Sequence, residues 1–259
     1  MPLLNGKTCY PDQINTPIFG VTVLSDTVIE QPLTKERHIL IYSPRGVVKL
    51  NFSDRIVICL PQHCILVPCG VPYQLEFIGT KECRFLYFKT DLFKTLDQER
   101  TFTVNPLLRA LIERIALLPF NHGLTQNNHL LGLIMEELSV LPTTPISLQL
   151  PKNIKIKTAL DHYKNIEKIP SLEEIARYCS YNVKTVTRNF SKETGLTYRQ
   201  WMQQMFFIFA VEALANGCAI CKITEKLPFA NDSAFSYFFR SFSGLSPKQF
   251  QHNLNNSSI

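Results

Sequence analysis

Four side chains between residues 184 and 192 have the chemistry to bind DNA. Lys184, Thr187, Arg188 and Lys192 recur at the spacing of one helix face. Lysine and arginine donate hydrogen bonds to base acceptors and to phosphates, and a hydroxyl can donate or accept. A helix that presents these groups and packs through its other face fits the major groove. The pattern predicts a DNA-reading helix, although a solvated helical hairpin would show the same spacing.

A short helix is predicted just before this segment. Ser171 and Glu174 match a capping box, in which each side chain binds the backbone amide of the other residue. A helix should therefore begin at Leu172. Its apolar residues share one face, and they are Leu172, Ile175, Ala176 and Cys179.

The candidate reading helix has its own start and stop signals. Asn182 is a good N-cap, and Gly195 can adopt the positive φ that ends a helix. The face opposite the cations carries Val183, Val186 and Phe190. Residues 171–195 thus predict two packed helices joined by a turn at 180–182.

Residues 220–250 repeat this unit. Phe190 corresponds to Phe239, 49 positions later, whereas the offset before the turn is 48, so Ala230 is a one-residue insertion. The corresponding cap and reading positions are Asn231, Ser233, Ser236 and Tyr237, in place of Asn182, Lys184, Thr187 and Arg188. Two such units would present two recognition helices to successive major grooves.

Two motifs carry a family resemblance. ETGLTYRQW ends the first unit, AFSYFFRSFSGLSPKQF ends the second, and a long helix is predicted between them. With these motifs, residues 171–251 resemble the DNA-binding domain of the AraC/XylS transcriptional regulators. The resemblance implies a sequence-specific bacterial regulator whose partner is double-stranded DNA and which needs no cofactor.

The sequence departs from the family pattern in the second unit and in the helix between the units. Thr224 and Pro228 stand where the family usually has small residues, and Pro228 cannot take the positive φ of a turn glycine. Phe206 and Phe209 stand where the family usually has arginines. We expect base discrimination to be concentrated in the first unit.

The helix predicted between the units, residues 198–216, is unusually apolar. It begins with a capping box at Thr197, and five large apolar residues follow one another from Met205 to Phe209. Such a run covers more than one full turn, so the two units can bury only part of it. We hypothesise that Phe206 and Phe209 dock on the N-terminal domain or on a second subunit. A thicker core between the units is the alternative.

The net charge of +6 lies in the C-terminal part of the chain. Residues 1–150 carry 13 Lys+Arg against 13 Asp+Glu, and residues 151–259 carry 14 against 8. The whole surplus therefore accompanies the repeated unit, as expected if that part meets phosphates.

The first 90 residues read as short strands separated by Pro, Gly, Asn and Asp, which favours a barrel or jelly roll. YSPRGVVKLNF and ILVPCGVPYQLEF are similar to the pattern of cupin-like effector domains. The predicted strands are 21–24, 39–42, 47–51, 55–60, 64–67, 74–78 and 85–88. The expected fold is α+β, with a cupin-like domain and a helical hairpin followed by an all-α domain with two helix-turn-helix units.

A catalytic cupin would hold a metal on histidines and a carboxylate. Here there is no HxH pair, and Tyr73 stands where a PxGxxH pattern would place a histidine. The sequence therefore predicts no metal site and no enzyme. A cupin-type enzyme with a helical appendage is the alternative function.

A shell without catalytic ligands could still enclose a small-molecule effector. The candidate lining residues are Tyr42, Phe52, Tyr73 and Phe77. Aromatic residues in strands are more often core than ligand contacts, and a sensor that binds a protein is equally compatible with the sequence.

Two amphipathic helices are predicted at 106–118 and 129–141. One should cover the sheet, and the other either offers a dimer surface within 105–141 or completes the monomer core. The proline-rich stretch that follows predicts an extended linker at 143–151. The predicted domains are a sensor at 1–142 and a DNA-binding domain at 152–252, followed by a tail at 253–259.

The eight cysteines are expected to be reduced, and the CxxC of Cys218 and Cys221 has no second pair at zinc-site spacing. The N-terminus lacks the pattern of a signal peptide, and no stretch approaches the length of a spanning helix. The sequence thus predicts a cytoplasmic protein.

Overall fold

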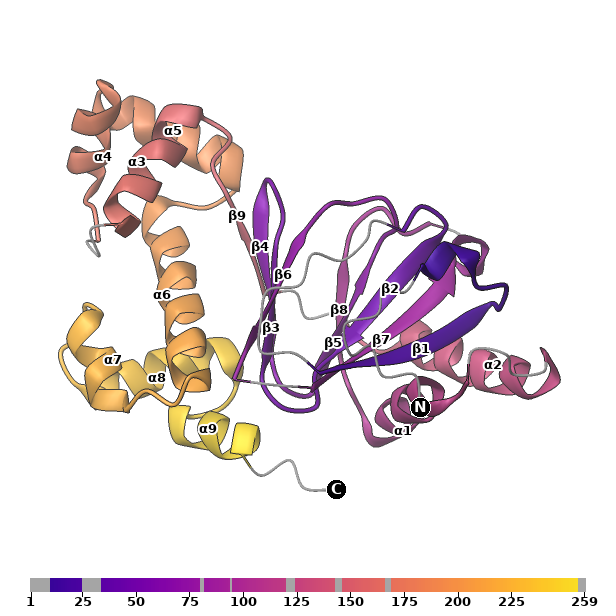
Figure 1. The fold of residues 1–259 in the computed structure, drawn as a ribbon. Coiled ribbons are helices and arrows are strands. Elements are labelled where there is room, and N and C mark those ends of the chain that lie inside the picture. Colours follow the sequence, from indigo (N-terminus) through magenta and orange to yellow (C-terminus); the bar gives the residue numbers. More distant parts are fainter. Residues whose placement is uncertain are drawn as a thin grey trace.

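A computed structural model describes residues 10–24, 34–79, 82–93, 95–119, 124–142, 146–165 and 169–255. Two antiparallel β-sheets and two helices form the N-terminal part, and helices α3 to α9 form the C-terminal part (Figure 1). The predicted α+β fold, with a β-rich N-terminal domain followed by an all-α domain, is confirmed. None of the helices in these ranges has the length and hydropathy needed to span a bilayer.

The two sheets face each other. One has the strand order β1-β7-β2-β5-β8 and the other has the order β6-β3-β4-β9. The strands are β1 (Ile18–Leu24), β2 (Arg37–Tyr42), β3 (Val47–Asn51), β4 (Arg55–Cys59), β5 (His63–Val67), β6 (Gln74–Ile78), β7 (Glu82–Lys89), β8 (Arg100–Thr103) and β9 (Ile146–Gln149). Alternate residues of β1 to β7 fill the space between the sheets, as the period of two requires.

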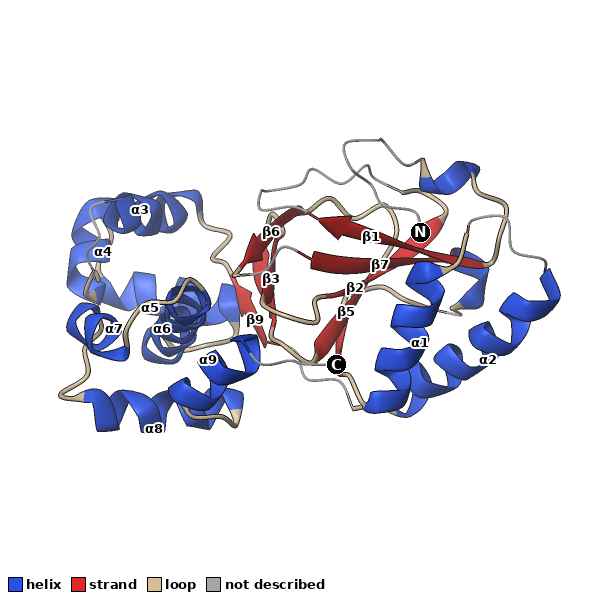
Figure 2. Ribbon diagram, turned by 60° about the horizontal axis from the view of Figure 1, so that its bottom comes forward, coloured by secondary structure: helices blue, strands red, loops and turns tan. Residues whose placement is uncertain are grey.

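Helices α1 (Pro106–Leu117) and α2 (Leu124–Val140) cover the outer face of the five-stranded sheet. They lie on the side away from α3 to α9 (Figure 2). A Cβ on Gly20 of β1 would lie 2.7 Å from the Cα of Ala116, so α1 passes directly over this strand. Both helices bury apolar residues here, including Ile112 and Ile134. Leu133 and Val140 of α2 stay exposed.

The sequence missed two strands. Both are four residues long, too short for a clear alternation, and each is held by a distant strand: β8 pairs with β5 and β9 pairs with β4. Of the predicted linker at 143–151 the structure describes residues 146–151, and Ile146–Gln149 is the edge strand of the second sheet. The chain therefore enters the helical part directly from the sheet.

The remaining helices repeat one arrangement twice around α6. They are α3 (Ile154–Asn165), α4 (Leu172–Cys179), α5 (Val183–Thr194), α6 (Tyr198–Ala215), α7 (Ile220–Lys226), α8 (Asp232–Ser243) and α9 (Pro247–Asn255). In Figure 1 the helix α6 runs between the cluster of α3 to α5 and the cluster of α7 to α9. The predicted tail at 253–259 begins inside α9.

Candidate nucleic-acid interface

The first helix-turn-helix forms as its caps predict. Ser171 Oγ accepts the amide of Glu174 at 3.2 Å, and Glu174 Oε2 accepts the amide of Ser171 at 2.8 Å. Ser180 ends α4 with φ 56°, and Asn182 Oδ1 then accepts the amide of Thr185 at 2.7 Å. The turn and both helix ends are thus fixed by local hydrogen bonds.

Helix α5 packs through Val186 and Phe190, which are both fully buried. Val183 is 37% exposed, so its predicted place in this core is wrong. It stands at the first position of α5, directly after the turn. The packing face is therefore shorter than the apolar spacing suggested.

The opposite face of α5 is open to solvent. The structure exposes the four predicted reading residues, Lys184, Thr187, Arg188 and Lys192. The Thr187 hydroxyl donates to the carbonyl of Val183 at 2.9 Å, which leaves its lone pairs as acceptors. The face thus offers three cations and one hydroxyl acceptor.

The second unit repeats the first with a different turn. Asn231 Oδ1 accepts the amide of Ala234 at 2.9 Å and Gly244 ends α8 with φ 74°, so both ends of the helix match those of α5. Leu227 ends α7 in an extended conformation, where the first unit has the left-handed Ser180. Pro228 follows it. The turn is built differently, as the proline predicted.

The exposed face of α8 carries less charge than that of α5. Ser233 and Tyr237 are exposed, Tyr237 by 80%, and Ser236 is half-buried. Arg240 is also exposed, and sequence reasoning missed it. Its spacing from Ser233 and Tyr237, i, i+4 and i+7, was the available signal, because these positions share one helix face.

Aromatic contacts join each unit to α6. Phe190 packs edge-on against Trp201 with ring centres 5.3 Å apart, and Phe239 lies 5.3 Å from Phe207. Each recognition helix therefore packs on α6 through its own buried phenylalanine. The relative position of the two recognition helices depends on this helix.

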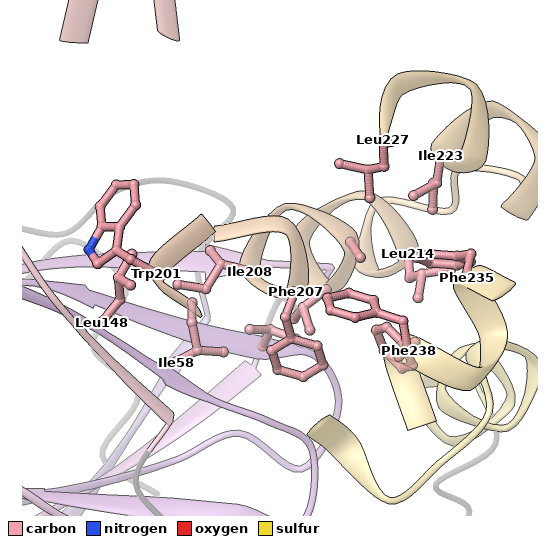
Figure 3. Packing of buried hydrophobic residues seen from close by; sticks show 14 of the residues in the cluster. Ile58, Leu148, Trp201, Phe207, Ile208, Leu214, Ile223, Leu227, Phe235 and Phe238 are labelled. Carbon is pink, nitrogen blue, oxygen red and sulfur yellow. The ribbon is translucent and has the colours of Figure 1, made fainter. Parts of the chain in front are cut away.

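The same helix docks on the second β-sheet. Figure 3 shows Ile58 and Leu148 of the sheet beside Trp201 and Ile208 of α6, and all four belong to one buried cluster. The indole Nε1 of Trp201 donates to the carbonyl of Gln149 at 2.7 Å. The N-terminal domain and the DNA-binding helices thus share a core.

An ion pair and a close backbone approach also hold α6 against the second sheet. Lys49 Nζ lies 2.6 Å from Glu212 Oε1 and 3.4 Å from Glu76 Oε2. Burial opposes the charge of Lys49, but the two carboxylates outweigh it and raise the lysine pKa. A Cβ on Gly79 would lie 2.3 Å from the carbonyl oxygen of Ala215, so only glycine allows the approach.

The residues that dock differ from those expected. Phe206 packs against Phe229 of the second unit at 6.5 Å, and Phe209 is 36% exposed. The docking face instead follows the spacing of Trp201, Ile208, Glu212 and Ala215. Phe206 and Phe209 lie on other sides of the helix because each residue turns it by about 100°.

The four candidate pocket residues do not lie together. Phe52 and Tyr73 are neighbours between the sheets, with ring centres 5.8 Å apart, and Phe77 joins the same core. Tyr42 points the other way, into the core under α1. Successive strand residues alternate between faces, and Tyr42 is on the outer face of its sheet.

The residues that catalytic cupins use for metals are not gathered here. Among the described residues, no three His, Cys, Asp or Glu side chains come together as metal ligands. His38 Nδ1 accepts the amide of Cys69, and His63 Nδ1 lies 3.1 Å from the carbonyl of Pro61. Cys218 and Cys221 are exposed free thiols.

The chain is similar to several known proteins. Residues 175–253 match the model of a helix-turn-helix domain family. The chain is 25% identical over 217 residues to the transcriptional regulator NimR of Escherichia coli, covering 82% of this chain and 78% of NimR. It is 30% identical over 80 residues to the regulator RipA of Corynebacterium glutamicum, which covers 31% of this chain and 24% of RipA. Among solved structures, ToxT of Vibrio cholerae O395 aligns over 93% of this chain and 98% of its own, with 12% identity and a TM-score of 0.39.

A repeated helix-turn-helix with an exposed basic helix, joined to a double-sheet domain, defines a DNA-binding transcriptional regulator. The chain is similar to helix-turn-helix transcriptional regulators, and the family model matches its residues 175–253.

Proposed function

We propose that α5 reads base edges in the major groove through Lys184 and Arg188. The observation that carries this proposal is the exposed face of α5, whose cations stand on a helix fixed by two caps and a buried phenylalanine. A well-placed bidentate contact gives about 1 to 3 kcal/mol of base discrimination. Thr187 accepts from a base or a water, and Lys192 binds phosphate.

The second unit contributes mainly backbone contacts. Ser233, Ser236 and Tyr237 offer hydroxyls without charge, and the helix starts capped by Asn182 and Asn231 present amides that position phosphates. Arg240 adds a cation near the end of α8. Discrimination is concentrated under the first unit, and the protein acts on DNA in the bacterial cytoplasm.

A small molecule bound between the sheets controls this activity. The Tyr73 hydroxyl supports such a ligand, because it is buried and has no hydrogen-bond partner in the described residues. Burial raises the pKa of Tyr73, so the hydroxyl stays neutral and can form a hydrogen bond to a ligand. Phe52 and Phe77 line the same core. The sheet that packs on α6 closes this core on one side, which links ligand and DNA-binding helices.

Homodimerisation through the helical hairpin is supported by exposed apolar side chains. Leu107 and Leu117 of α1 are 48% and 47% exposed, and Leu133 and Val140 of α2 are 43% and 70% exposed. A second copy that packs on these residues would remove them from water.

Genome-wide recovery of bound DNA fragments tests the function. Wild-type protein should enrich a shared sequence, and the Arg188→Ala variant should lose preference at one base of that sequence. Non-specific recovery with both proteins would refute base reading by α5. Metal analysis of purified protein tests the enzyme alternative, which stoichiometric iron, manganese or zinc would support.

A further inference from the structure

A groove of about 430 Å³ lies between the two helix-turn-helix units. Its walls come from four parts of the chain: the segment before α4, the helix α6, the turn between α7 and α8, and α8 itself. The residues that matter for its chemistry are Ile169, Arg199, Met202, Phe206, Pro228 and Phe229. This volume falls within the range of small-molecule sites.

The floor of the groove is apolar. Phe229 packs against Phe206 at 6.5 Å and against Phe238 at 4.7 Å, and Ile169 at the edge is 41% exposed. Phe206 and Pro228, two of the positions at which the sequence departs from the family pattern, both line it. Aromatic and aliphatic carbon left in contact with water favours an apolar occupant.

Among the described residues that line the groove, Arg199 is the one cation. Arg199 is exposed, and no carboxylate among the described residues forms an ion pair with it. Gln203 adds an amide beside it. The Tyr198 hydroxyl already donates to the carbonyl of Pro170. The free donors at the rim thus belong to a guanidinium and an amide, which suit a carboxylate or sulfonate.

We propose that this groove binds a small amphipathic anion, with its apolar body on Phe206 and Phe229 and its anionic group at Arg199. The site is separate from the core between the sheets. Because its walls belong to both units, an occupant favours one arrangement of α5 and α8. That consequence for DNA rests on the proposed function, whereas binding itself does not.

Two fluorescent probes with the same apolar body test the site in the full-length chain without DNA. 8-Anilinonaphthalene-1-sulfonate carries a negative charge, and N-phenyl-1-naphthylamine does not. The chain has one tryptophan, Trp201 on α6, so energy transfer from its indole to a bound probe reports occupancy near this helix. We expect one site per chain, with the charged probe bound about two- to fivefold more tightly, as an exposed ion pair allows.

Two groove variants separate the two contributions. Arg199→Glu should abolish the preference for the charged probe while the neutral probe still binds. Phe206→Arg should weaken both probes because it removes the apolar floor. The control is Lys248→Glu on α9, an exposed cation that does not line the groove, and it should leave both affinities unchanged.

Circular dichroism and the thermal midpoint establish that each variant is folded. Equal affinities for the two probes in the wild type, or binding unchanged by both groove variants, would overturn the proposal. Loss of the signal in Tyr73→Phe would show that the probe binds in the core between the sheets, and it would also overturn the proposal. Failure of the wild type to bind DNA would count against the proposed function and leave the probe results intact.

Discussion

Lys49 of the N-terminal sheet and Glu212 of α6 form an ion pair between the two domains, with Nζ and Oε1 2.6 Å apart. The side chains are 12% and 28% exposed, so water screens the pair only in part. Together with the Trp201 hydrogen bond to Gln149, this pair fixes the helix that carries both recognition units. The position of α6 on the sheet depends on these two contacts.

Replacing Glu212 by glutamine should destabilise the protein. The change leaves the Lys49 ammonium with only the more distant Glu76, and we expect the free energy of unfolding to fall by about 1 to 3 kcal/mol. Urea unfolding followed by circular dichroism measures this loss. The matched control is Glu76→Gln, whose carboxylate lies 3.4 Å away and is 39% exposed, and which should cost less than about 1 kcal/mol. Equal losses would show that Glu212 has no special role.

The isolated helical part, residues 151–259, should be less soluble than the whole chain. Without the sheet, Trp201 and Ile208 are uncovered, and both are nearly fully buried in the intact protein. The substitution Ile208→Lys should restore solubility to the fragment. Phe209→Lys is the control, because Phe209 is already exposed. Rescue by Phe209→Lys alone would place the docking face on the wrong side of α6.

The two recognition helices should contribute unequally to DNA affinity. Arg188→Ala should cost about 1 to 3 kcal/mol and relax one base position, whereas Arg240→Ala should weaken all sequences alike and lower the salt dependence by about one ion. Fluorescence anisotropy titrations at several salt concentrations distinguish these effects. Tyr237→Ala is the comparison for Arg188→Ala, and equal losses from the two would contradict the asymmetry.

Stability should decrease below neutral pH because of buried histidine. Burial lowers the pKa of His38, partly offset by its hydrogen bond to Thr90, and burial also lowers the pKa of His63. Protons then bind the unfolded chain more readily, so this stability is complete above the unfolded pKa of about 6.5 and is lost as pH falls toward the folded value.

Urea unfolding at a series of pH values between 7.5 and 5 measures this slope. In His38→Asn the amide oxygen can replace Nδ1 as the acceptor for Cys69, while the titratable group is removed. The slope should then be smaller by up to about one proton. An unchanged slope would mean that His38 does not titrate differently in the folded state.

The sequence by itself determined the recognition units. Their caps, Ser171 with Glu174, Asn182 and Asn231, bind amides three residues away, and their apolar faces repeat at helical spacing, so both signals are local. The strands at β3 and β6 were also predicted at their observed bounds, because apolar and β-branched runs there end at turn residues.

Only the tertiary structure decided how these parts meet. The strand Ile146–Gln149 forms because β4 supplies its hydrogen bonds. No local sequence pattern predicts a pairing strand about 90 residues earlier. An apolar run around a helix indicates that several sides of the helix are buried. It does not indicate which element covers each side. The sheet covers Trp201 and Ile208, and the second unit covers one side of Phe206, since only three-dimensional packing assigns a partner to each face.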